Sequence, residues 1–217
     1  MAHFEIEDCT LLMKMGGLPT AVNLRELRDR IAICSPDVIY YHFCETPLVP
    51  SFDNPDYRND LAVWSKLHLG DRVLAERLGI LDPYSFADLE ELRNVILELI
   101  DERLSELPVV PAAPPGSEFY FKEATIVVFD TGERVEHPTG LAAAIARMTN
   151  GSIYFHFLEA RRRAPMGIDD FSLWLGNFEG EFDHMVHALN SMDFAFYTLS
   201  ELRNALVRAL GECGGER

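Results

Sequence analysis

The sequence lacks the long apolar run that a membrane-spanning helix requires. No stretch reaches the roughly 18 consecutive apolar residues that such a helix needs. The first residues, Met-Ala-His-Phe-Glu-Ile-Glu-Asp, contain neither a basic start nor a long apolar core, so we expect no secretory signal. We therefore predict a cytoplasmic protein that has no membrane partner.

Positive charge is also scarce. The chain has 19 Lys and Arg residues against 35 Asp and Glu residues, which gives a formal net charge of -16. Nucleic acids and anionic membranes attract proteins of the opposite sign. We therefore predict no nucleic-acid partner, and we interpret the acidic surface as a device for solubility.

Signatures of metal, nucleotide and hydrolase chemistry are missing. There is no Cys-x-x-Cys, Gly-x-x-x-x-Gly-Lys, Gly-x-Gly-x-x-Gly, Gly-x-Ser-x-Gly or His-Glu-x-x-His motif. We predict no cofactor, no metal and no disulfide framework, and we expect buried thiols at the four cysteines, Cys9, Cys34, Cys44 and Cys213.

What the sequence does contain is an internal repeat. Residues 39–45 read Ile-Tyr-Tyr-His-Phe-Cys-Glu, and residues 153–159 read Ile-Tyr-Phe-His-Phe-Leu-Glu, 114 positions later. Leu-x-Glu-Leu-Arg-Asn also occurs twice, at 89–94 and 199–204, and Phe4 matches Phe119. We interpret the chain as a tandem duplication of a unit of roughly 100 residues, which is an ordinary size for a domain.

A proline-rich stretch separates the two copies. Residues 108–116 read Pro-Val-Val-Pro-Ala-Ala-Pro-Pro-Gly, which cannot form a helix and is typical of a semi-rigid linker. We predict a first repeat at 1–107, a linker at 108–116 and a second repeat at 117–217. We expect the repeats to pack around a pseudo-twofold axis, as an isologous dimer would.

The local patterns predict a predominantly helical α+β fold. Residues 3–17 and 118–132 favour extended structure, and Asp130-Thr131-Gly132 indicates a turn, consistent with a hairpin. Helix starts are expected at Asn23, Asp88 and Thr198, each followed three residues later by Glu. Ser35-Pro36-Asp37 predicts a helix through the first repeated segment.

On such a helix, His42 and Glu45 lie on the side opposite Ile39 and Phe43. A His and a carboxylate on one face can ligate a metal or form an acid/base pair. The structural alternative is that His42 bonds a carboxylate or a backbone group and that Glu45 pairs with Arg93, with Glu159 and Arg203 as the second such pair. The candidate binding residues recur in both copies: Tyr40, His42, Glu45, Asp60, Trp64, Arg93, Tyr154, His156, Glu159, Asp170, Trp174 and Arg203.

The whole pattern resembles a known family. Ile-Tyr-Tyr-His-Phe at 39–43, Asn-Asp-Leu-x-x-Trp at 59–64 and the Leu-x-Glu-Leu-Arg helices are similar to those of bacterial proteins grouped as the domain of unknown function numbered fifty-seven fifty-two. Copy 2 departs from the pattern at Asp169 and Phe155. The resemblance implies a bacterial, cytoplasmic protein and assigns no catalytic residue.

Two hypotheses for function follow. The first is a non-enzymatic binding or regulatory module that engages a protein or a small ligand. The alternative is an enzyme or a metal-binding protein with paired His/Glu sites between the repeats. The sequence decides neither for nor against catalysis, and it gives no oligomeric state.

Overall fold

The computed structural model describes residues 3–45, 48, 57–163, 167–194 and 197–214. These residues form a mixed α+β fold that is mostly helical, as predicted. The strands and α-helices are β1 (Phe4–Met15), α1 (Leu24–Ile33), α2 (Pro36–Tyr40), α3 (Asp60–Leu67), α4 (Arg72–Gly79), α5 (Leu89–Glu106), β2 (Lys122–Val135), α6 (Leu141–Ile145), α7 (Asn150–Ile153), α8 (Asp170–Leu175), α9 (Asp183–Asn190) and α10 (Leu199–Gly214).

Short helices of other types complete the fold. The π-helices are Tyr41–Glu45 and Tyr154–Leu158, and the 3-10 helices are Pro83–Ser85, Pro138–Gly140, Glu159–Arg162 and Gly176–Phe178. None of the helices in the described residues is long and apolar enough to cross a membrane. Cys9, Cys34 and Cys44 are buried, as expected, whereas the side chain of Cys213 lies outside the described residues.

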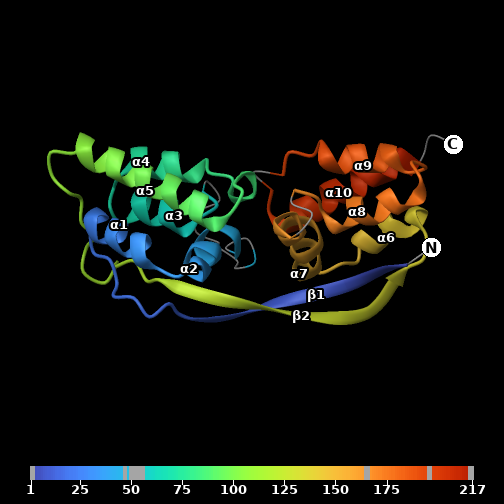
Figure 1. Cartoon of the computed structure of the whole chain (residues 1–217), viewed down its shortest axis with the longest axis horizontal. Helices are drawn as coiled ribbons and strands as arrows, with labels where there is room; N and C mark the ends of the chain where they lie inside the picture. The colour runs from blue at the N-terminus through green and yellow to red at the C-terminus, as the bar shows by residue number, and fades with distance from the viewer. Residues whose placement is uncertain (1–2, 46–47, 49–56, 164–166, 195–196, 215–217) are drawn as a thin grey trace. The chain divides into compact units, whose positions relative to one another are not determined.

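The strands β1 and β2 pair as a long two-stranded ribbon (Figure 1). The predicted extended segments are therefore confirmed, but the predicted turn at 130–132 is wrong because β2 continues through it to Val135. Gly132 has a positive φ of 78°, and its N–H donates to Asp130 Oδ1 at 2.7 Å. The turn chemistry is thus satisfied locally within the strand, while Thr131 Oγ1 donates to the carbonyl of Ile6 in β1 at 2.6 Å.

The chain divides into two compact units whose bounds differ from the predicted repeats. Unit 1 comprises Met1–Leu11 and Ile126–Arg217, and unit 2 comprises Leu12–Thr125. The predicted linker belongs to unit 2, where the carbonyl of Pro111 accepts from the Leu24 N–H and the Ala113 N–H donates to Val22. Each unit therefore contains an extended segment from the other half of the sequence.

In unit 2, helices α1 to α5 surround an apolar core (Figure 1). The helix α1 buries Leu24, Leu27 and Ile31, which recur at the spacing of one helix face. Its start is capped as predicted, because Asn23 Oδ1 accepts from the Glu26 N–H at 2.9 Å. In unit 1, helices α6 to α10 and the π-helix Tyr154–Leu158 bury a corresponding set of large side chains, including Tyr154, Phe157, Phe171, Leu206 and Leu210.

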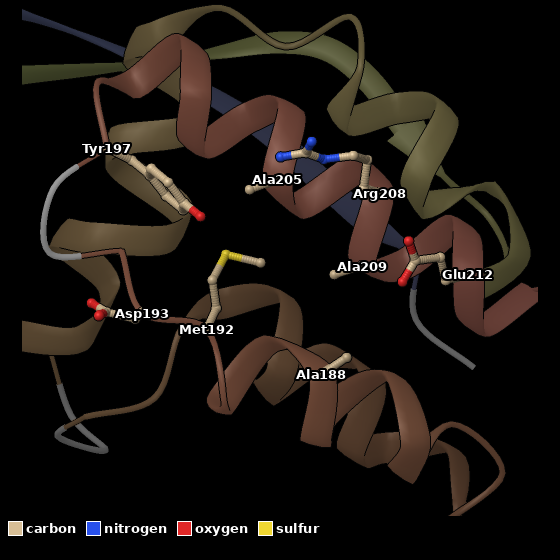
Figure 2. Close-up of a pocket in the computed structure, with 8 residues that line it drawn as sticks. All are labelled: Ala188, Met192, Asp193, Tyr197, Ala205, Arg208, Ala209 and Glu212. Carbon is tan, nitrogen blue, oxygen red and sulfur yellow. The ribbon is translucent and has the colours of Figure 1, made fainter.

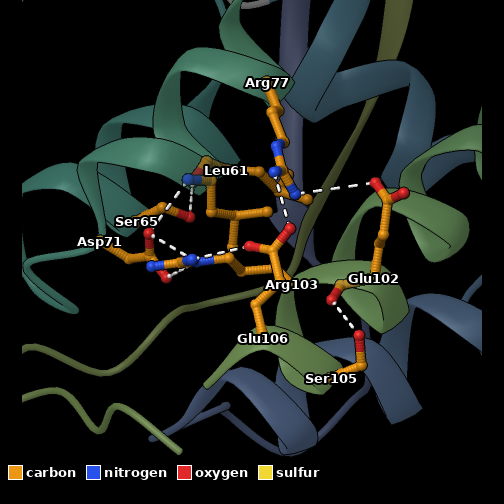
Figure 3. A network of polar contacts seen from close by, with 9 residues as sticks. Leu61, Ser65, Asp71, Arg77, Glu102, Arg103, Ser105 and Glu106 are labelled. Atoms are coloured by element: carbon orange, nitrogen blue, oxygen red, sulfur yellow. Dashed lines mark hydrogen bonds and ion pairs between the residues drawn. The ribbon is translucent and has the colours of Figure 1, made fainter.

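A network of charged side chains joins α4 to α5 in unit 2 (Figure 3). Asp71 is buried, caps α4 through the Leu74 N–H at 3.0 Å, and pairs with Arg103 of α5 at 2.8 Å. Arg103 and Arg77 both bind Glu106 at 2.8 Å, and these bonds hold the pKa of that carboxyl below its usual range. Asp71 is the buried member on which the network depends.

We expect Asp71→Ala to lower the free energy of unfolding by about 2–4 kcal/mol, since it removes a helix cap and leaves Arg103 without its buried partner. The control is Arg72→Ala, whose exposed pair with Glu76 contributes less than about 0.5 kcal/mol. Urea unfolding followed by circular dichroism measures both variants. Equal midpoints for the two would contradict this account of the network.

Candidate functional site

The repeated segments form helices that change type in the middle. In unit 2, α2 passes into the π-helix Tyr41–Glu45, and in unit 1, α7 passes into the π-helix Tyr154–Leu158. The predicted helix is confirmed, but its predicted polar side is wrong, because all five residues of each π-turn are buried. The hydrogen bond of a π-turn spans one more residue than that of an α-turn, and such turns are frequent at functional sites.

Both ring nitrogens of His42 are engaged. Its Nδ1 lies 2.8 Å from Asp60 Oδ2, and its Nε2 accepts the backbone N–H of Lys122 at 3.1 Å. An N–H donor requires a lone pair on Nε2, so the proton sits on Nδ1 and points to the carboxylate. His42 is therefore a neutral imidazole that joins α3 to the extended segment.

His156 repeats this arrangement in unit 1. Its Nδ1 lies 2.8 Å from Asp170 Oδ2, and its Nε2 accepts the backbone N–H of Glu7 at 2.9 Å. Here the carboxylate has a further partner, since Arg163 donates to Asp170 Oδ2 at 2.9 Å. The two clusters thus share the His–Asp pair and the bond to the strand, and they differ in the added cation.

A phenylalanine of the extended segment packs against each imidazole. The centroid of the Phe4 ring lies 4.9 Å from that of the His156 ring and 5.5 Å from that of the Trp174 ring. The centroid of the Phe119 ring lies 4.8 Å from that of the His42 ring and 5.6 Å from that of the Trp64 ring. Neither phenylalanine was among the predicted site residues, although the match of Phe4 with Phe119 between the two copies indicated a shared role.

The remaining predicted residues lie around these clusters without joining them in one cavity. Trp64 Nε1 donates to the carbonyl of Ser117 at 2.8 Å. Tyr40 is half-buried against the core of unit 2, and Tyr154 is fully buried in unit 1. Glu45 is fully buried, and Glu159 is half-buried at the start of the 3-10 helix Glu159–Arg162.

The predicted ion pairs of the arginines are wrong. Arg93 donates to the carbonyls of Ile31 and Cys34 at 2.7 and 2.9 Å and pairs with Glu90 rather than with Glu45. Arg203 likewise donates to the carbonyl of Met148 at 2.8 Å. Carbonyls at a helix C-terminus lack partners inside the helix and attract a cation, which accounts for the position of Arg93 at the end of α1.

The geometry defines what the clusters can do chemically. A metal ligand or a general base needs a free imidazole nitrogen, and here both nitrogens hold protein groups. Within the described part of the chain, no three His, Cys, Asp or Glu side chains gather as a metal site would require. The arrangement is suited to holding a strand in place.

An open groove of about 420 Å³ lies elsewhere in unit 1, between α9 and α10 (Figure 2). Met192 and Tyr197 point into it, and three alanines of the two helices, Ala188, Ala205 and Ala209, line it. None of the predicted site residues contributes to this groove.

Comparison with known proteins places this arrangement in a family. Residues 1–211 match the family described as "Family of unknown function (DUF5752)". The chain belongs to this family. The match spans both units, so one family domain includes both His–Asp clusters.

A solved structure shares the fold of this DUF5752 protein. "The structure of OrfY from Thermoproteus tenax" is 26% identical, with a TM-score of 0.78 over 97% of this chain and 95% of that chain. No curated protein matches the chain. The comparisons therefore show a family and a fold, and they assign no activity.

We expect His42→Ala and His156→Ala each to lower the free energy of unfolding by about 1–3 kcal/mol, because each removes a buried imidazole that accepts a strand N–H and bonds a carboxylate. His187→Ala, on an exposed position of α9, is the control and should change it by less than about 0.5 kcal/mol. Chemical denaturation measures all three. An unchanged stability in both cluster variants would refute the structural role.

Burial raises the pKa of Tyr41 from its ordinary 10.0 to about 12, and the charges of Asp60 and Glu45 act in the same direction. The folded chain holds this phenolic proton more tightly than the unfolded chain, so the associated stability is present below pH 10 and is lost as the pH rises through about 12. We expect wild type to lose more stability than Tyr41→Phe over that interval, measured by denaturation at each pH. Parallel losses in the two proteins would contradict the assignment.

Proposed function

We propose that this protein is a non-enzymatic binding or regulatory module that engages another protein. The supporting observation is a run of exposed apolar side chains on β2 in unit 1. Val127 and Val128 are each 38% exposed, and Phe129 is 48% exposed. Successive residues of a strand point to opposite faces, so the strand presents apolar side chains on both faces there. Val127 and Phe129 share one of these faces, and an exposed apolar patch is typical of an interaction surface.

The hydrogen bonds of the two histidines support binding over catalysis. Each imidazole is occupied by a carboxylate on one side and a backbone N–H on the other. The alternative function, an enzyme or a metal-binding protein using paired His/Glu sites, would need at least one of those nitrogens to be released. We therefore place the binding hypothesis first.

We also propose that the chain arose by tandem duplication, with the extended segments exchanged between the copies. The repeated His–Asp pair, the bond from its second nitrogen to a strand, and the neighbouring tryptophan in both units support this origin. Packing of the repeats about a pseudo-twofold axis stays a prediction that small-angle scattering would test. The bacterial origin and the cytoplasmic location also stay predictions.

The test of the binding function uses a photoreactive benzoyl-phenylalanine in the native host. Placed at Phe129, it should give protein adducts on irradiation, because that side chain is exposed on the proposed surface. Placed at the exposed Asn190 of α9, it serves as the control and should give none of the same adducts. Mass spectrometry identifies the adducts.

Identical adducts from both positions, or none from either, would contradict the proposal. Elemental analysis provides a separate check. Stoichiometric metal in the purified protein that disappears on replacing His42 and His156 by Ala would favour the alternative function instead.

A further inference from the structure

The open groove between α9 and α10 in unit 1 has a filled counterpart between α4 and α5 in unit 2. The helices α4 and α9 each have eight residues. The third and the seventh residue are buried in both helices: Leu74 and Leu78 in α4, and Met185 and Leu189 in α9. The sixth positions therefore correspond, and they carry Arg77 in α4 and Ala188 in α9.

The last helix of each unit aligns through its repeated sequence. Leu-x-Glu-Leu-Arg-Asn begins at 89 in α5 and at 199 in α10, 110 positions later. Ala209 in α10 therefore corresponds to Leu99 in α5. Glu212 corresponds to Glu102, so this carboxylate is present in both units. Unit 1 thus has a shorter side chain on each of the two helices and keeps the acidic group.

In unit 2 the side chain of Arg77 crosses from α4 to α5 (Figure 3). Its guanidinium lies 2.8 Å from a carboxylate oxygen of Glu106 and 3.6 Å from one of Glu102. Leu99 packs against the core beside this network. Unit 2 therefore holds an arginine between its helices, whereas unit 1 has the groove of about 420 Å³ lined by Ala188 and Ala209.

The groove in unit 1 retains a carboxylate that can bind a cation. Glu212 lines it (Figure 2). Within the described residues Glu212 forms no hydrogen bond or ion pair, although Arg208 lies one helical turn earlier. The small side chains of Ala188 and Ala209 leave room for the methylene groups of an arginine, which pack on apolar surface while the charged end reaches a polar partner. A guanidinium has the planar geometry that matches a carboxylate.

We propose that this groove accepts an arginine side chain of a partner protein, in the position that Arg77 takes in unit 2. The guanidinium pairs with Glu212, and the methylene groups lie along Ala188 and Ala209. The net charge of -16 attracts a basic partner and so favours an arginine-bearing one. The inference rests on the proposed function in that the ligand belongs to a protein, but the groove is a different surface from the exposed length of β2.

The test titrates a capped arginine, Nα-acetyl-arginine N-methylamide, into the full chain carrying isotope-labelled alanine and methionine methyl groups. Nuclear magnetic resonance should show the largest shifts at Ala188, Ala209 and Met192, which line the groove. The capped arginine should bind at least about fivefold more tightly than capped citrulline, which has nearly the same shape without the charge. Equal affinities for the two compounds, or shifts centred elsewhere, would overturn the proposal.

Three variants locate the binding. Glu212→Gln should reduce the affinity for capped arginine to that for capped citrulline, because it removes the charge from an exposed side chain. Ala188→Arg should abolish binding, because the introduced side chain fills the groove as Arg77 does in unit 2. His187→Arg is the matched control, since it adds the same charge at the neighbouring exposed position, outside the groove, and binding should persist.

Binding that survives both Glu212→Gln and Ala188→Arg would overturn the proposal. If circular dichroism shows that Ala188→Arg does not fold, Glu212→Gln alone decides. Free arginine distinguishes a metabolite from a protein, because it carries an ammonium and a carboxylate where the capped compound has peptide groups. Tighter binding of free arginine would overturn the assignment to a protein partner.

The outcomes for the groove and for β2 can be told apart. Loss of the adducts at Phe129, with capped arginine still bound, would refute the surface proposed on β2 and leave the groove supported. Adducts at Phe129 without binding of capped arginine would overturn the groove alone.

Discussion

The structure of each unit depends on one hydrogen bond from a strand backbone to a buried imidazole. The Nε2 of His42 and the Nε2 of His156 accept an N–H from Lys122 and Glu7, respectively. A buried imidazole nitrogen without a partner costs free energy comparable to a lost hydrogen bond, and the strand N–H supplies that partner. The bond also determines the tautomer, because it places the ring proton on Nδ1, where the carboxylate of Asp60 or Asp170 accepts it. One interaction thus links helix, imidazole and strand.

The π-turns make this interaction possible. In an α-helix of the same sequence, the repeated segment 39–45 would separate into an apolar side and a polar side. The wider turn Tyr41–Glu45 instead buries His42 together with Phe43, so one short stretch contributes to the core and also bonds to the strand. The turn Tyr154–Leu158 does the same for His156 and Phe157. Because the polar groups are satisfied inside the protein, burial of the imidazoles is compatible with stability.

Much of the local structure could be predicted from the sequence, because local chemistry determines it. Asn23, Asp88 and Thr198 each accept from the N–H three residues later, as their spacing from Glu predicts. The structural alternative for His42, a bond to a carboxylate or to the backbone, is also confirmed, and both bonds are present.

The errors concern choices between distant partners. The sequence pattern of residues 4–11 predicts a strand but says nothing about its partner. It therefore did not predict that these residues belong to unit 1. The Asp130-Thr131-Gly132 pattern predicted a turn because its local bonds are those of a turn, and only pairing with β1 extends the strand. The long side chain of Arg93 was expected to reach Glu45. It instead donates to the carbonyls of Ile31 and Cys34 at the end of α1.

A comparison of the two units separates the contacts that hold the fold from the surfaces that are free to differ. The His–Asp pair, the tryptophan and the phenylalanine of the extended segment recur in both units with nearly equal distances. On the last helix of each unit the repeated Leu-x-Glu-Leu-Arg-Asn aligns Ala209 with Leu99 and Arg208 with Glu98, so the side chains that line the open groove in unit 1 differ in size and charge from their counterparts. A strand-holding cluster tolerates little change because each of its groups satisfies a buried partner. Surfaces such as α10 and the exposed length of β2 are therefore where the two units are free to differ.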